Sequence, residues 1–170
     1  MNEKEWLEKS LISYFIKAIN NMHNTNYSIT IHRDRPDFII GDTLQNKNFG
    51  VEITHLFYDE EEAKELLGHV PMINSKVENI EHYINILNKL LNKKAHKAKA
   101  YDHSHELVLL VGITSPLFTW GDFENSREYI VIPQNDFSII CLVFFNEEHQ
   151  NWEDLMFIKQ ECPICDINIV

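Results

Sequence analysis

The sequence predicts a single α/β domain over residues 1–170, in which a mixed central β-sheet is flanked by helices. Three observations support this class. A segment near the N-terminus repeats its apolar residues with the period of a helix. Several short segments alternate polar and apolar residues, or are continuously apolar, as strands do. A second, longer helical pattern separates two groups of these strands, and no internal repeat or linker divides the chain.

Residues 3–22 predict an amphipathic helix. Its expected apolar stripe consists of Leu7, Leu11, Phe15, Ala18 and Met22. Glu8 falls close to this stripe. An acid beside an apolar face is either a boundary residue that reaches water or a residue that faces the interior for a purpose such as metal binding. The sequence leaves both interpretations open.

Two neighbouring strand segments, residues 35–40 and 49–56, each carry one acid. Alternate residues of a strand share a face, so Glu52 and Thr54 lie on one face of the second segment. If the two strands pair through the turn between them, Asp37 and Glu52 converge at one end of the sheet. Two carboxylates among apolar residues cost desolvation energy unless positive charge lies between them. Mg²⁺ is typically held by one or two carboxylates, which makes a divalent cation the expected partner.

Further strands are expected before and after this pair. Residues 27–32 alternate in the manner of a half-buried strand, and residues 106–113 and 137–145 are short apolar runs typical of buried strands. Residues 152–157 predict a turn or a short strand, and residues 167–170 are a candidate for a last edge strand.

A long helix is expected from about residue 74 or 75 to residue 100. Its apolar stripe contains Ile80, Ile84, Leu87, Leu91 and Ala98. Lys76 and Lys94 fall within the width of this stripe, and the C-terminal half holds the only basic cluster of the chain. Helix-dipole compensation explains most of that cluster. It does not explain Lys94, for which a phosphate-facing or acid-pairing role is expected. The acidic run at 59–62 is expected to begin a short, exposed helix.

The composition narrows the possible functions. The formal net charge of −11 and the pI of about 5.2 argue against a strong, nonspecific DNA binder, because such binding depends on Lys and Arg. No apolar run approaches the roughly 20 residues of a membrane-spanning helix, and the N-terminus lacks the order of a signal peptide. We therefore expect an intracellular, cytoplasmic protein. A glycine-rich phosphate loop and a GxSxG nucleophile elbow are both absent from the sequence.

The cysteines and two loop histidines offer weaker candidates for metal binding. Cys162 and Cys165 have CxxC spacing, and Cys141 with His149 completes a set of four zinc ligands on paper. Reduced cysteines without a metal are the favoured interpretation. His103 and His105 lie in a loop without an evident third ligand, and we expect them at the surface.

Pro36-Asp37, followed after a hairpin-length gap by Glu52-Ile53-Thr54, resembles the motif of the PD-(D/E)xK nuclease superfamily. In that superfamily a helix precedes strands that carry an Asp and an E-x-K motif, and a helix and further strands follow. The same order is expected here across residues 3–113, so the resemblance implies a restriction-endonuclease-like fold. It also implies that Asp37, Glu52 and the backbone carbonyl of Ile53 are metal ligands, and that Glu8 is a further acid from the first helix.

The resemblance implies a Mg²⁺- or Mn²⁺-dependent nuclease, an endonuclease or exonuclease that hydrolyses phosphodiester bonds of nucleic acid, with DNA favoured over RNA. The departure from the pattern is Thr54, which stands where the superfamily has a lysine that helps to activate water and stabilise developing charge. Some members recruit a lysine from the following helix, and Lys94 and Lys76 are the candidates for such a role here.

Two other interpretations remain open. The domain is alternatively a catalytically inactive nuclease-like protein that acts as a protein-binding or regulatory subunit, which the missing motif lysine and the acidic charge both favour. An acidic nuclease, for its part, often needs a protein partner or a homodimer to assemble a basic groove. A third interpretation places Glu52 and Lys94 in a buried salt bridge of an unrelated α/β domain, where such a pair contributes little net stability.

Overall fold

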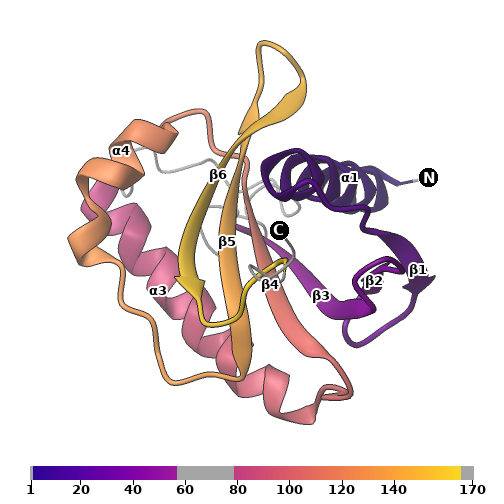
Figure 1. Ribbon diagram of the computed structural model, residues 1–170. Helices are drawn as coiled ribbons and strands as arrows, with labels where there is room; N and C mark the ends of the chain where they lie inside the picture. The colour runs from indigo at the N-terminus through magenta and orange to yellow at the C-terminus, as the bar shows by residue number, and fades with distance from the viewer. Residues whose placement is uncertain (1, 57–78, 166–170) are drawn as a thin grey trace.

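The computed structural model describes residues 2–56 and 79–165, which form a six-stranded mixed sheet with helices on both faces (Figure 1). This confirms the predicted α/β class. The elements in chain order are α1 (Glu3–His23), β1 (Ser28–His32), β2 (Phe38–Asp42), β3 (Lys47–Leu56), α3 (Ile80–Lys97), η1 (Ala98–Ala100), β4 (Glu106–Ile113), α4 (Trp120–Asn125), η2 (Arg127–Tyr129), β5 (Phe137–Asn146) and β6 (Asn151–Gln160).

The strands lie in the sheet in sequence order, from β1 at one edge to β6 at the other. β1, β2 and β3 form an antiparallel meander, and β3, β4 and β5 are parallel. β6 turns back and pairs antiparallel with β5. Parallel neighbours require a crossover connection, and α3 lies in the crossover between β3 and β4.

Each face of the sheet has its own apolar core. α1 covers one face, where Leu11, Ile12 and Phe15 join the cluster that contains Val51 and Ile53 of β3. α3 and α4 cover the opposite face, where the second cluster gathers apolar residues of these helices and of β4 and β5. The alternation of β3 therefore sends Glu52 toward the α3 face, since Val51 and Ile53 point to α1.

α1 matches the predicted helix in extent but not in its buried stripe. Asn2 caps its N-terminus in a capping box with Glu5, as helix-starting residues of these types do. Ile12 and Ile19 are buried, whereas Met22, which was expected in the stripe, is 59% exposed. The prediction was wrong here because the last turn of α1 carries Met22 over a groove beside β6 instead of over the core.

Three other elements differ from expectation. β1 is an exposed edge strand instead of a half-buried one, because none of its residues joins either core. β6 spans ten residues, which exceeds the short strand or turn expected at 152–157, and its whole length pairs with β5. α3 begins at Ile80, after Asn79 caps it in an extended conformation, later than expected.

The strands expected around 38–42, 49–57, 106–113 and 137–145 are present as β2, β3, β4 and β5. Three expectations lie outside the described residues: the acidic run at 59–62, the position of Lys76 and the edge strand at 167–170. Of the helices in the described ranges, none has both the length and the apolar character that crossing a membrane requires.

Candidate functional site

β2 and β3 bring the two predicted acids together. Their antiparallel register pairs Phe38 with Val51, so the next position along the pair sets Asp37 opposite Glu52. Asp37 lies just before β2, and its Oδ2 accepts a hydrogen bond of 2.8 Å from the backbone N–H of Ile53. This bond fixes the Asp37 carboxylate against β3, beside Glu52.

Glu52 is buried, with 8% of its side chain exposed, and its two carboxylate oxygens have different surroundings. Oε1 accepts a hydrogen bond of 3.1 Å from Lys94 Nζ and one of 2.8 Å from the hydroxyl of Tyr101. Oε2 is buried and has no hydrogen-bond partner among the described residues. An unsatisfied buried carboxylate oxygen is costly, so Oε2 is the atom of the site that a further ligand would satisfy.

The electrostatics of Asp37 match this arrangement. Burial, followed by the negative charge of Glu52, raises the pKa of Asp37 from 3.8 to about 7. The Ile53 N–H and the positive charge of Lys94 oppose this increase, and Glu8 adds to it. Asp37 therefore does not ionise easily beside Glu52 without additional positive charge.

Glu8 of α1 lies near enough to Asp37 for its negative charge to raise the pKa of Asp37. Its side chain is 19% exposed and forms an ion pair of 3.6 Å with Lys4 one turn earlier. Among residues 2–56 and 79–165, no group of three or more His, Cys, Asp or Glu is close enough to hold a metal ion. Asp37 and Glu52 thus offer at most a two-carboxylate site, which water would have to complete.

Lys94 extends from α3 to the acid pair, as its position within the apolar stripe predicted. Only 14% of its side chain is exposed. The acid-pairing role expected of Lys94 is therefore present in the structure. A buried pair of this kind is also what the salt-bridge interpretation requires, so the contact by itself does not assign a function.

Tyr101 is the residue of the site that the sequence did not indicate. It follows η1, and burial together with the hydrogen bond to Glu52 raises the pKa of its hydroxyl. A tyrosine just after a basic helix has no periodic pattern that separates it from a surface residue. Only the packing of α3 and η1 against β3 brings its hydroxyl to Glu52.

The other candidate residues of β3 lie on different faces of the strand. Thr54 shares the face of Glu52 on β3 and is half-buried. His55 lies on the opposite face, stacked near Trp152, and burial lowers its pKa to about 4. The ring is therefore neutral at physiological pH. Ile53 donates its backbone N–H to Asp37, and the role of its carbonyl as a metal ligand stays a prediction.

The cysteines do not gather into the four-ligand set considered from the sequence. Cys141 is fully buried in β5, and His149 pairs with Glu153 at the β5–β6 hairpin. Cys162 and Cys165 are not bonded to each other, and Cys165 instead contacts His23. His103 bonds through its Nε2 to the carbonyl oxygen of Ala98.

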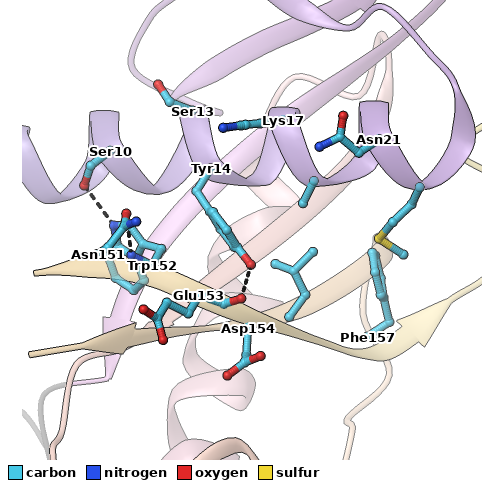
Figure 2. Close-up of a pocket in the computed structure, with 13 residues that line it drawn as sticks. Ser10, Ser13, Tyr14, Lys17, Asn21, Asn151, Trp152, Glu153, Asp154 and Phe157 are labelled. Atoms are coloured by element: carbon cyan, nitrogen blue, oxygen red, sulfur yellow. Dashed lines mark hydrogen bonds between the residues drawn. The ribbon is translucent and has the colours of Figure 1, made fainter. Parts of the chain in front are cut away.

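A groove of about 780 Å³ lies between α1 and β6, away from the acid pair (Figure 2). Two hydrogen bonds join its walls: the hydroxyl of Tyr14 donates to the carbonyl of Glu153, and Trp152 Nε1 donates to Ser10 Oγ at 2.8 Å. None of the sequence-predicted site residues within the described part of the chain lines this groove. Its size alone does not make it the functional site, because it carries no buried charge that awaits a partner.

Comparison with family models, characterised proteins and solved structures gives no match for this chain. The functional argument therefore rests on the geometry of Asp37, Glu52, Lys94 and Tyr101.

Proposed function

We propose that the protein is a divalent-metal-dependent phosphodiesterase with a restriction-endonuclease-like fold, which hydrolyses nucleic acid at the Asp37–Glu52 pair. One observation carries this proposal: two carboxylates from adjacent strands meet beside a lysine from the crossover helix. The order of elements supports it, since a helix, an antiparallel strand meander, a helix and a parallel strand follow one another as the PD-(D/E)xK resemblance implies.

The residues present fit a magnesium-type ion. Glu52 Oε2 is buried without a partner among the described residues, and Asp37 resists ionisation beside it. A cation between them would relieve both costs together, and oxygen ligands with several retained waters are what Mg²⁺ prefers. When bound, the ion would supply an activated water and polarise the scissile phosphate.

The chain's own residues have distinct tasks in this proposal. Lys94 and Tyr101 hold Glu52 Oε1, which leaves Oε2 as the oxygen for the ion. Lys94 also keeps a fixed positive charge at the site, where it stabilises negative charge that develops on the phosphoryl oxygens. It thereby replaces part of what the motif lysine would provide at Thr54, whose hydroxyl can hydrogen-bond a water but carries no charge.

The exposed side of α3 supplies the contact with the nucleic-acid backbone. Lys89 and Lys97 of α3 and Lys99 of the following η1 are exposed, and none of them forms an ion pair within the described part of the chain. Glu81 is the only acidic residue of α3. This helix is thus a local basic surface on an acidic protein, and phosphate contacts through lysines position a nucleic acid without reading its sequence.

The test incubates the purified chain with labelled single- and double-stranded DNA and RNA in Mg²⁺ or Mn²⁺. We expect cleavage that EDTA abolishes and that Asp37→Asn and Glu52→Gln reduce by about 100-fold or more, as loss of charge stabilisation in a site does. Asp34→Asn is the matched control, because Asp34 is an exposed acid on the same segment. Cleavage by both site variants at the parent rate, or no cleavage of any substrate, would show that the proposal is wrong.

A non-catalytic, protein-binding role is the second candidate, and one observation favours it: Lys94 already neutralises Glu52 in a chain that lacks the motif lysine. Calorimetric titration with Mn²⁺ separates the two functions. Binding that is lost in Asp37→Asn supports the enzyme, whereas no binding to the parent protein supports the regulatory role.

A further inference from the structure

The segment that follows β6 carries two cysteines that the proposed function does not use. Cys162 and Cys165 are separated by Pro163 and Ile164, and both thiols are unbonded and half-buried. The CxxC spacing permits either a metal ligand pair or a dithiol that closes to a disulfide. No metal-holding group of three or more ligands exists in residues 2–56 and 79–165, so the dithiol is the interpretation to examine.

Two contacts hold the centre of this segment in place. Lys47 Nζ donates a hydrogen bond to the carbonyl of Pro163, and the hydroxyl of Tyr27 donates one to the carbonyl of Ile164. The Ile164 side chain is 1% exposed and belongs to the core beneath α1. These contacts hold the backbone between the two cysteines against the α1 side of the sheet.

The two thiols have different surroundings. Cys165 Sγ lies 3.7 Å from Nδ1 of His23, in the last turn of α1. An imidazole nitrogen at this distance is placed to accept the thiol proton as the sulfur attacks. Cys162 instead packs against the core, and burial raises the pKa of its thiol. This asymmetry is typical of a dithiol in which one cysteine attacks and the other resolves.

We propose that Cys165, Cys162 and His23 form a thiol–disulfide exchange site that reacts with small disulfides of the glutathione type. The Cys165 thiol gives its proton to His23, and its sulfur attacks one sulfur of the external disulfide, so that a mixed disulfide forms and one thiol leaves. Cys162 then loses its proton and attacks Cys165 Sγ, which breaks the mixed disulfide and releases the second thiol. Two cysteine thiols are oxidised to one disulfide, the external disulfide is reduced to two thiols, and both protons end on the released thiols.

The experiment equilibrates the full reduced chain with mixtures of reduced and oxidised glutathione, alkylates the remaining thiols and measures intact mass. We expect the Cys162 and Cys165 thiols to disappear together and a disulfide to appear between them. Cys162→Ser is expected to stop at one glutathione adduct on Cys165. His23→Gln is expected to slow the first step about tenfold, because the proton acceptor is lost. His149→Gln, at the far β5–β6 hairpin, is the matched control and should react at the parent rate.

Far-UV circular dichroism of each variant checks that it is folded. Two separate glutathione adducts on the parent protein, with no disulfide at any ratio, would overturn the proposal. A His23→Gln variant that reacts as fast as the parent would overturn the assigned role of His23. Neither outcome bears on cleavage at Asp37 and Glu52, which uses none of these three residues.

Discussion

Replacing Asp37 by asparagine should make the metal-free protein more stable at pH 8. Asparagine keeps an oxygen that accepts the Ile53 N–H at the same position. It removes the negative charge that burial and Glu52 disfavour. The variant therefore separates the cost of the charge from the contribution of the hydrogen bond.

The size of the effect follows from the pKa of Asp37. An increase from 3.8 to about 7 corresponds to at most about 4 kcal/mol, at roughly 1.4 kcal/mol per pKa unit. Because Asp37 is partly exposed, solvent screening lowers this to about 1–2 kcal/mol. In a chain of 170 residues that difference raises the unfolding midpoint of Asp37→Asn by about 3–6 °C.

The pH dependence has a definite sign. Between pH 4 and pH 7 the folded protein binds a proton at Asp37 that the unfolded chain has released, so Asp37 lowers stability progressively as the pH rises through this window. Below pH 4 both states carry the proton, and the advantage of Asp37→Asn should vanish. Thermal unfolding in EDTA at pH 8, 6 and 4 measures this, with Asp34→Asn as a control that should change little at any pH.

Adding Mn²⁺ at pH 8 should reverse the order of stability. A cation at 100 times its Kd stabilises the parent by about 2.7 kcal/mol, whereas Asp37→Asn lacks one ligand and gains much less. The reasoning is refuted if Asp37→Asn is less stable than the parent in EDTA, since the carboxylate would then be favourable in the folded state. Equal stabilisation of both proteins by Mn²⁺ would refute the metal site but leave the argument from the Asp37 pKa intact.

Three further substitutions test the packing around the site, each by urea unfolding. Lys94→Met should lower the free energy of unfolding by about 3 kcal/mol, because it leaves the buried carboxylate of Glu52 unpaired. Lys97→Met, on the exposed side of α3, should cost less than about 0.5 kcal/mol, and equal costs for the two variants would contradict the buried pair. Gly112→Ala should cost about 1–3 kcal/mol, since the added methyl would lie 2.4 Å from the His55 ring and 2.9 Å from the Trp152 ring. An unchanged urea midpoint would contradict this close packing. Leu11→Ala should cost about 2–5 kcal/mol and Met22→Ala, on the same helix, less than about 0.5, and the reverse order would contradict the buried face of α1.

The sequence located the acid pair because its evidence is local. Period-2 alternation fixed the face of Glu52, and the short turn between two strand segments fixed which strand is its neighbour. A strand register shifted by one residue would place Glu52 on the α1 face, so the structure could have contradicted this prediction. Lys94 was found by the same kind of argument, since a charged residue within an apolar helical stripe must have a partner at the sheet.

The residues and elements that were missed depend on contacts between distant segments. β6 contains Glu153, Asp154 and Lys159, which hide its strand character in the sequence. Its pairing with β5 decides its conformation instead. The exposure of β1 likewise depends on which strands the helices cover, and the role of Tyr101 depends on how α3 packs against β3. Periodicity carries no information on such choices.

The two carboxylate oxygens of Glu52 bear on whether its ion pair is structural or part of a functional site. A pair that serves stability alone gains most when both carboxylate oxygens are bonded, yet here Lys94 and Tyr101 share Oε1 and Oε2 has no partner among the described residues. Asp37 beside it adds a second cost in the same place. Costs of this kind concentrate at functional sites, where a ligand offsets them. If Asp37 is only structural, Asp37→Asn should stabilise the protein without any loss of cation binding. If Asp37 belongs to the site proposed here, the same substitution should gain stability and lose the cation together.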